Sequence, residues 1–184
     1  DTRRVSGHRP MSPGKRYDRA YFDQWYRKRG IGGARRLERK VALAVAMAEY
    51  HLERPLRSVL DIGCGEGAWR APLRKLRPDA TYLGFDASEY AIARYGRPRN
   101  LRLAKFGDFA MLRPCAPVDL LVCSDVLHYL SVKELDRGLP GLAELCGGVA
   151  FLEAFAKEDQ AVGDEHEFQA RPASFYRKRF EKLG

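Results

Sequence analysis

Long apolar segments are missing from this sequence of 184 residues. No run comes near the roughly 20 consecutive apolar residues that a membrane-spanning helix needs. The N-terminus, from Asp1 to Lys15, is polar and basic, without the apolar stretch that marks a secretory signal. We therefore expect a cytoplasmic protein, and the length allows one domain with a real core.

Cysteine clusters are missing as well. The four cysteines form neither a CxxC pair nor a group with histidine; they are Cys64, Cys115, Cys123 and Cys146. We interpret them as reduced thiols that pack as small apolar side chains, which argues against a disulfide framework or a zinc site. No bound metal is expected.

Acidic residues are too few to balance the basic ones at the start of the chain. The net charge is +9; residues 1–40 carry 13 lysines and arginines against 4 acidic residues, and the rest carries 20 of each. Such a segment can attract phosphate or another anion. The alternative is a solvated leader followed by a helix. We predict a flexible basic leader over residues 1–16.

Residues 17–55 are predicted to form a helical lid segment. Its first part carries aromatic side chains that recur four residues apart and would share one broad face of a short helix; they are Tyr17, Tyr21, Phe22, Trp25 and Tyr26. A second helix is expected over 34–53, because apolar residues recur there at three- and four-residue steps before Pro55.

Strands and helices alternate over the remaining core segment, 56–184. The expected strands are 58–62, 81–85, 100–104, 118–123 and 148–153, and the expected helices are 68–76, 89–95, 132–145 and 172–183. Runs such as Leu120-Leu121-Val122 are apolar on both faces, as in parallel strands that helices cover. The pattern predicts a doubly wound α/β fold with a mostly parallel sheet, helices on both faces and an N-terminal helical cap.

Three glycines follow the first expected strand, in the stretch VLDIGCGEG that runs from Val59 to Gly67. Gly63, Gly65 and Gly67 allow backbone angles and close approaches that a Cβ would block. The N–H groups at the start of the next helix can face an anionic or polar ligand. The stretch predicts a nucleotide-cofactor loop; a turn that merely needs glycine is the alternative.

An acidic residue ends the second expected strand. Asp86 comes one helix and one strand after the glycine loop, at a place where a carboxylate can accept hydrogen bonds from both ribose hydroxyls of an adenosine. The alternative is an acidic cap before Ser88. The loop and the carboxylate together are far more specific than either alone.

Four motifs, in this order and spacing, resemble class I S-adenosylmethionine-dependent methyltransferases: VLDIGCGEG, FDAS, FGDF and DLLVCSDVLHYL. The match covers about residues 56–153. The resemblance implies a Rossmann-like, seven-stranded sheet that carries S-adenosylmethionine across the C-terminal ends of its strands. It says little about the methyl acceptor.

The resemblance also implies a set of cofactor-binding residues. Those near the methionine portion and the sulfonium are Asp61, Gly63, Cys64, Gly65, Ser124 and Asp125. Those near the adenosine are Asp86 on the ribose, Ala87 beside the adenine, Asp108 on its amino group and Phe109 against its ring. Three have other readings: Asp108 is typical of a turn, Phe109 of a core and Asp125 of a helix N-terminus.

Two histidines are candidates for a general base. His128 follows Asp125 by three residues, and His166 lies in an acidic loop that could cover the acceptor site. Transfer from a sulfonium mainly needs alignment and desolvation, so a base matters only where the acceptor carries a proton. A packed, hydrogen-bonded histidine is the alternative.

The lid is expected to contribute to the acceptor side. Tyr21 and Tyr26 are predicted to close over the cofactor or the acceptor, and Arg27, Arg35 or Arg36 to pair with the methionine carboxylate. The alternative is that the aromatic side chains are the buried face of a capping helix.

Departures from the family pattern narrow the chemistry. The fourth strand ends in Cys123-Ser124-Asp125-Val126 rather than the Asn/Asp-Pro-Pro-aromatic signature of many amino-group methylases, and Glu153 alone does not make a catechol-type magnesium site. The family usually finishes with an antiparallel hairpin. We expect that hairpin to be missing after Gly184, which would leave an exposed strand edge.

The favoured function is methyl transfer from S-adenosylmethionine to a small-molecule acceptor. The second hypothesis is an RNA or protein methyltransferase whose basic segment, 1–40, binds phosphate. The third is a nicotinamide-dependent oxidoreductase or a non-catalytic nucleotide-binding module. The loop reads Gly-x-Gly-x-Gly rather than Gly-x-Gly-x-x-Gly, which disfavours a dinucleotide. The oligomeric state is left open.

Overall fold

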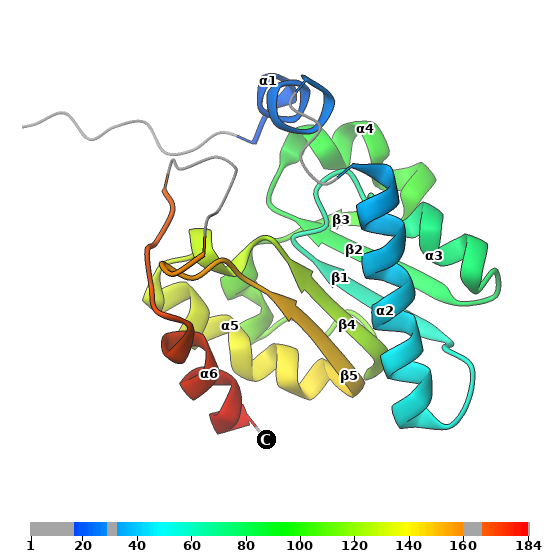
Figure 1. Cartoon of the computed structure of the whole chain (residues 1–184). Coiled ribbons are helices and arrows are strands. Elements are labelled where there is room, and N and C mark those ends of the chain that lie inside the picture. Colours follow the sequence, from blue (N-terminus) through cyan, green and yellow to red (C-terminus); the bar gives the residue numbers. More distant parts are fainter. Residues whose placement is uncertain (1–16, 29–32, 160–166, 184) are drawn as a thin grey trace, which may run out of the picture.

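A parallel sheet forms the centre of the molecule. The computed structural model describes residues 17–28, 33–159 and 167–183. The strands are β1 (Ser58–Ile62), β2 (Thr81–Asp86), β3 (Leu101–Leu103), β4 (Val118–Ser124) and β5 (Cys146–Glu153). They lie in the order β3-β2-β1-β4-β5, and every pair is parallel (Figure 1). The order confirms the predicted doubly wound, Rossmann-like sheet.

Helices cover both faces of this sheet (Figure 1). One face packs against α2 (Ala34–Leu52), α3 (Arg70–Leu76) and α4 (Glu89–Arg99), and the other against α5 (Val132–Leu145) and α6 (Ala173–Phe180). The short helices are α1 (Arg19–Phe22), the π-helix η1 (Asp23–Lys28) and the 3-10 helices η2 (Phe106–Ala110), η3 (Leu127–Tyr129) and η4 (Glu181–Leu183).

The alternation of side chains along the strands divides the core in two. In β4, Leu120 and Val122 pack with the α2 side, whereas Leu121 and Cys123 pack with the α5 side. All four are at most 1% exposed. The strand is therefore apolar on both faces for the reason expected of a covered parallel sheet.

Several predicted boundaries differ from the structure by a few residues, and two of the helix boundaries have a clear local cause. The helix expected to end at residue 95 runs to Arg99, because Asn100 takes a left-handed conformation (φ 57°) and closes the helix there. The Asn100 side chain donates to the Tyr82 carbonyl at 2.7 Å, which fixes this end against β2. The helix expected from residue 68 starts at Arg70, because turns occupy the chain up to Trp69.

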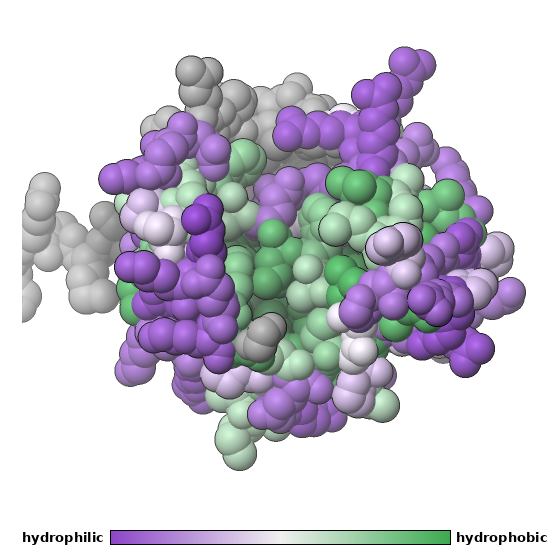
Figure 2. Space-filling model, turned by 60° about the horizontal axis from the view of Figure 1, so that its bottom comes forward, coloured by the Kyte–Doolittle hydropathy of each residue, from purple (hydrophilic) through white to green (hydrophobic). Residues whose placement is uncertain are grey.

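β5 is the last strand in the sheet order, and among the described residues nothing pairs with its outer side. Its apolar residues Val149, Phe151 and Leu152 are only half-buried. Figure 2, which brings the lower side of Figure 1 forward, shows a hollowed apolar area between hydrophilic flanks. In the described part of the chain, no helix is long and apolar enough to cross a membrane.

Candidate active site

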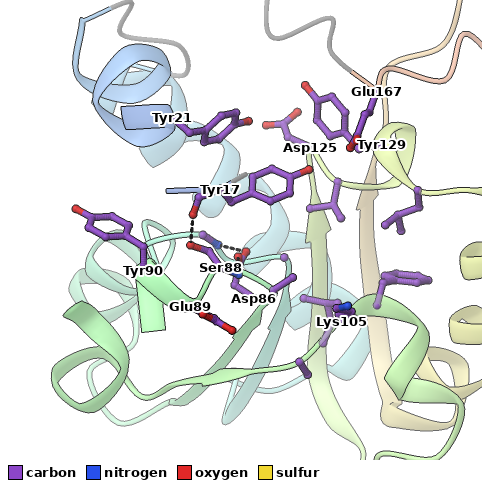
Figure 3. A pocket seen from close by; sticks show the side chains of 18 of the residues that line it. Tyr17, Tyr21, Asp86, Ser88, Glu89, Tyr90, Lys105, Asp125, Tyr129 and Glu167 are labelled. Atoms are coloured by element: carbon purple, nitrogen blue, oxygen red, sulfur yellow. Dashed lines mark hydrogen bonds between the residues drawn. The ribbon is translucent and has the colours of Figure 1, made fainter. Parts of the chain in front are cut away.

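A cavity of about 730 Å³ opens at the carboxyl ends of β1, β2 and β4 (Figure 3). Parallel strands bring these ends to one edge of the sheet, which is where ligands bind in doubly wound folds. The lining residues are Tyr17, Asp18, Tyr21, Phe22, Ile62, Gly63, Gly65, Asp86, Ala87, Ser88, Glu89, Tyr90, Ala104, Lys105, Phe106, Ser124, Asp125, Val126, Tyr129, Leu130, Glu134 and Glu167.

The glycine loop forms the floor of the cavity. Gly63, Gly65 and Gly67 have φ angles of 74°, 55° and 75°, which only glycine adopts without strain. The amide of Gly63 donates to the Phe85 carbonyl at 2.7 Å and so ties the loop to β2. A Cβ on Gly63 would clash with a methyl carbon of Val126, so the loop also needs glycine to pack under the end of β4.

Asp86 is held at the end of β2 by backbone amides. One carboxylate oxygen accepts from the Gly65 amide at 2.7 Å and the other from the Ser88 amide at 2.8 Å. A carboxylate has about four lone-pair sites, so Asp86, which lines the cavity, keeps acceptor capacity for a further donor. Burial raises the pKa of Asp86, and hydrogen bonds from the backbone of Ser88, Gly65 and Ala87 oppose that rise.

The N-terminal segment covers the glycine loop and the start of α4. Phe22 is 3% exposed, and its ring lies beside Gly65 and 5.9 Å from the Tyr90 ring, between centroids. The Ser88 hydroxyl donates to the Tyr17 carbonyl. Figure 3 shows Tyr17 and Tyr21 on the side of the cavity opposite Lys105. Tyr21, which was predicted as a lid residue, therefore faces the cavity.

The end of β3 presents a different set of residues from the one expected. Ala104, Lys105 and Phe106 line the cavity. Asp108 is exposed on η2, where its carboxylate accepts from the Lys105 amide at 2.8 Å, as a turn aspartate does. Phe109 is fully buried, as is typical of a core residue. Its ring packs edge-on against the ring of Phe85, with 5.4 Å between the ring centroids.

A polar cluster joins the ends of β4 and β5 to helix α2. The Lys40 ammonium donates to Ser124 Oγ at 3.3 Å, forms an ion pair with Glu153 and lies 3.6 Å from an Asp125 carboxylate oxygen. Ser124 Oγ itself donates to Glu153. Ser124 and Asp125 line the cavity, as expected, whereas Lys40 was not anticipated.

Two expected loop residues lie beneath the cavity rather than on its wall. Asp61 is 2% exposed and accepts a hydrogen bond from the Tyr82 hydroxyl at 2.6 Å. Its burial raises the pKa to about 7, against the opposing effect of that hydrogen bond. Cys64 is buried, and burial raises the pKa of its thiol. All four cysteines are free thiols.

The histidine predictions have different outcomes. His128 is 1% exposed, accepts from the Phe155 amide through Nδ1 at 3.2 Å, and packs on the rings of Phe155 and Phe168. It is not among the residues that line the cavity, and its role as a general base stays a prediction. His166 lies outside the described residues, and the side chain of Tyr26 does as well.

The predicted arginines lie on or before α2. Arg27 belongs to η1, but its side chain lies outside the described part of the chain. Arg35 and Arg36 are exposed on α2. The positive charge of Arg36 lowers the pKa values of Asp125 and Glu153, although burial, which raises both values, has a larger effect. The Arg36 guanidinium therefore acts on the polar cluster.

Several residues in the cavity or beside it were not predicted from the sequence. Lys105 directly precedes the FGDF motif and Phe106 opens it, whereas the residues expected at the cofactor were the last two of that motif. Tyr129 follows His128 directly. Both belong to the 3-10 helix η3, and Tyr129 lines the cavity whereas His128 does not. Lys40 carried no local signal, because one lysine on a charged helix is usually a solvated one.

Comparisons with known proteins point to one family. Residues 60–148 match the family described as "Methyltransferase domain". Trans-aconitate 2-methyltransferase of Deinococcus radiodurans is 34% identical in an alignment of 134 residues that covers 68% of this chain and 50% of that protein. The chain therefore spans about half the length of this curated relative.

Solved structures share the fold at lower identity. A SAM-dependent methyltransferase from Archaeoglobus fulgidus superposes with a TM-score of 0.65 at 17% identity, over 90% of this chain and 72% of that one. Magnesium protoporphyrin IX methyltransferase from Synechocystis, with bound SAH, gives 0.62 at 20% identity, over 84% and 74%. Both likenesses concern the arrangement of strands and helices.

Proposed function

Because this chain belongs to the class I S-adenosylmethionine-dependent methyltransferase superfamily, we propose that it transfers a methyl group from S-adenosylmethionine to a small-molecule acceptor. The observation that carries the proposal is the pairing of the glycine loop with Asp86 at the edge of one cavity.

The residues present fit the methyl donor. The Asp86 carboxylate lines the cavity and keeps acceptor capacity, which suits a ribose hydroxyl. Ala87 and Phe106 offer apolar surface beside it for the adenine, and Gly63 and Gly65 leave room for the amino-acid portion. Asp61 and Cys64 are buried at this loop, and direct roles for Asp61, Cys64, Asp108 and Phe109 stay predictions.

The chemistry asks the protein for alignment more than for acid–base work. When bound, S-adenosylmethionine supplies an electrophilic methyl group; the acceptor's lone pair forms the new bond, and the electrons of the broken carbon–sulfur bond stay on sulfur. Tyr17, Tyr21 and Phe22 cover the cavity and exclude water. Such alignment and desolvation supply most of the acceleration in reactions of this kind.

The small-molecule acceptor follows from the relatives and from the covered cavity. The curated relative is named for trans-aconitate, a small molecule. Tyr21 lines the cavity on the side opposite Lys105 (Figure 3), and Phe22 packs beside Gly65, so both residues help to enclose the cavity. We therefore propose a small-molecule acceptor.

Calorimetry with S-adenosylhomocysteine (SAH) and with NAD tests this function. We expect SAH to bind and NAD to bind far more weakly. Asp86→Ala should weaken SAH binding by about 100-fold or more, because two charge-assisted hydrogen bonds of about 1.5–3 kcal/mol each are at stake. Asp79→Ala, at an exposed turn aspartate before β2, is the matched control and should bind SAH normally. Tight NAD binding together with no SAH binding would overturn the proposal in favour of an oxidoreductase.

A further inference from the structure

Lys40 connects helix α2 to the ends of β4 and β5, two strands that lie far from it in the sequence. Lys40 stands 84 residues before Ser124 and 113 before Glu153, yet its ammonium bonds to both. The Lys40 side chain is only 17% exposed. A largely buried ammonium group with several oxygen partners is held in place far better than the ammonium group of an exposed lysine.

The third partner of Lys40 is Asp125, whose backbone is in an unusual conformation. Asp125 has a φ of 61°, in the left-handed region that costs a non-glycine residue about 1 kcal/mol or more. Its amide donates to the Glu153 carbonyl at 3.2 Å, so the backbone is tied to β5 at this point. This turn directs the Asp125 side chain into the cavity, where Figure 3 shows it between Tyr21 and Tyr129.

Two carboxylates meet here, and Lys40 stands between them. Glu153 raises the pKa of Asp125 by like-charge repulsion, in addition to the larger effect of burial, and Lys40 opposes both. Glu153 behaves differently: burial raises its pKa, but hydrogen bonds from Lys40 and Ser124 leave it below its ordinary value. Without the lysine the two carboxylates would repel each other and the turn would lose its tie to α2.

We propose that Lys40 is a positioning residue that keeps the Asp125 carboxylate ionised and directed at the point of methyl transfer. This inference rests on the proposed function, because that point is defined by the methyl donor in the cavity. Asp125 then offers its negative charge to the cationic end of the donor, and Lys40 acts only through Asp125, Ser124 and Glu153.

Sinefungin provides a probe that does not need the methyl acceptor. It carries an amine where S-adenosylmethionine carries its sulfonium methyl group, and SAH carries neither charge nor methyl there. The ratio of SAH to sinefungin dissociation constants therefore reports negative charge at the transfer point. We expect sinefungin to bind the wild-type chain about tenfold more tightly, which corresponds to about 1.4 kcal/mol.

The variants separate positioning from mere structure. Asp125→Asn and Lys40→Met should each bring the two affinities to within about twofold of each other, while Lys40→Arg should restore most of the preference because it restores the charge. Arg39→Met, at an exposed neighbour on the same helix, should keep the wild-type ratio. Circular dichroism monitors folding, and Lys40→Gln replaces Lys40→Met if the latter does not fold.

The outcomes are distinguishable from those of the proposed function. If Lys40→Met weakens SAH and sinefungin equally, the lysine is only structural and the inference is overturned. The same holds if Asp125→Asn leaves the ratio unchanged. Failure of the wild-type chain to bind SAH at all would instead overturn the proposed function.

Discussion

The charge state of Asp61 depends strongly on the fold. It lies in the middle of the sheet, and its carboxyl group is buried beside the Tyr82 hydroxyl. Burial raises its pKa to about 7, far above the value of an exposed aspartate. In the unfolded chain the same carboxyl group would release its proton at about pH 4.

This difference predicts a stability that falls as pH rises. Between about pH 4 and 7 the folded chain holds a proton that the unfolded chain has released, so the free energy of unfolding decreases with pH in that window. Asp61→Asn keeps an acceptor for Tyr82 and removes the titration. The free energy of unfolding of Asp61→Asn, relative to that of the wild type, should increase by about 3–5 kcal/mol from pH 4 to pH 8.

Urea unfolding at these pH values measures the effect. Asp79→Asn, at an exposed aspartate, should follow the wild-type pH dependence. Parallel pH profiles for the wild type and Asp61→Asn would show that Asp61 is ionised in the folded chain.

Gly63 is the second position where one residue decides the local structure. We expect Gly63→Ala to destabilise the chain by about 2–4 kcal/mol, because a φ of 74° strains alanine and its Cβ would clash with Val126. Gly107→Ala, whose Cβ would find its nearest neighbour at 3.6 Å, is the control.

A double variant separates the two causes. Adding Val126→Ala to Gly63→Ala should recover the share of the lost stability that is due to the clash. The share that is due to the strained φ angle should remain. Denaturant titration gives the four stabilities. Purely additive effects would mean that the loop moves away from Val126 rather than clashing with it.

At the scale of elements, α1 is a short cover rather than a part of the core. It has four helical residues and is anchored mainly through Phe22, which lies beside Gly65 and Tyr90. An element with so few buried contacts can open without unfolding the sheet. Closure of such a segment commonly sets how long a ligand stays bound.

Phe22→Ala should therefore speed SAH release by about tenfold or more while shifting the midpoint of thermal unfolding only slightly. Stopped-flow displacement gives the release rate, and circular dichroism gives the midpoint. Gln24→Ala, at an exposed position on η1, should change neither. An unchanged release rate in Phe22→Ala would show that α1 does not gate the cavity.

The periodic elements were predictable, and their ends were less so. Strands β1, β2 and β4 follow the expected ranges to within one residue, because continuous apolar runs bounded by turns have few other solutions. The end of α4 depends instead on the Asn100 side chain reaching the Tyr82 carbonyl on β2. That partner lies on a different element of the chain, beyond any local pattern.

At the scale of the whole molecule, the charge is divided between the start of the chain and the rest. The segment 1–40 holds the entire excess of +9. Part of this charge is used within the fold, since Lys40 is paired with Glu153 and lies close to Asp125. The hypothesis of an RNA-binding arm needs the remaining charge to contact several phosphates.

We expect a single-stranded RNA to bind weakly at about 200 mM salt, while SAH affinity stays the same at about 50 and 200 mM. Fluorescence anisotropy follows the RNA and calorimetry follows SAH. Tight RNA binding with a steep salt dependence would favour the nucleic-acid hypothesis, because each phosphate contact steepens the logarithmic slope by about 0.9 for a duplex and about 0.7 for a single strand.

The sequence by itself determined the family, the parallel sheet and the place of the cofactor loop. These depend on short-range patterns: the glycines that permit φ angles of 55° to 75°, the apolar runs of buried strands and the acidic residue Asp86 at a strand end. Each is set by residues that are neighbours in the chain, so each can be read along it.

Only the tertiary structure decided which side chains meet at the cavity. It turned Phe109 and His128 into the core and brought Phe106 and Tyr129 to the wall, because a turn of one or two residues reverses the direction of a side chain. It also joined Lys40 to Glu153 across 113 residues. The order of the strands in the sheet creates that contact, and no local pattern encodes strand order.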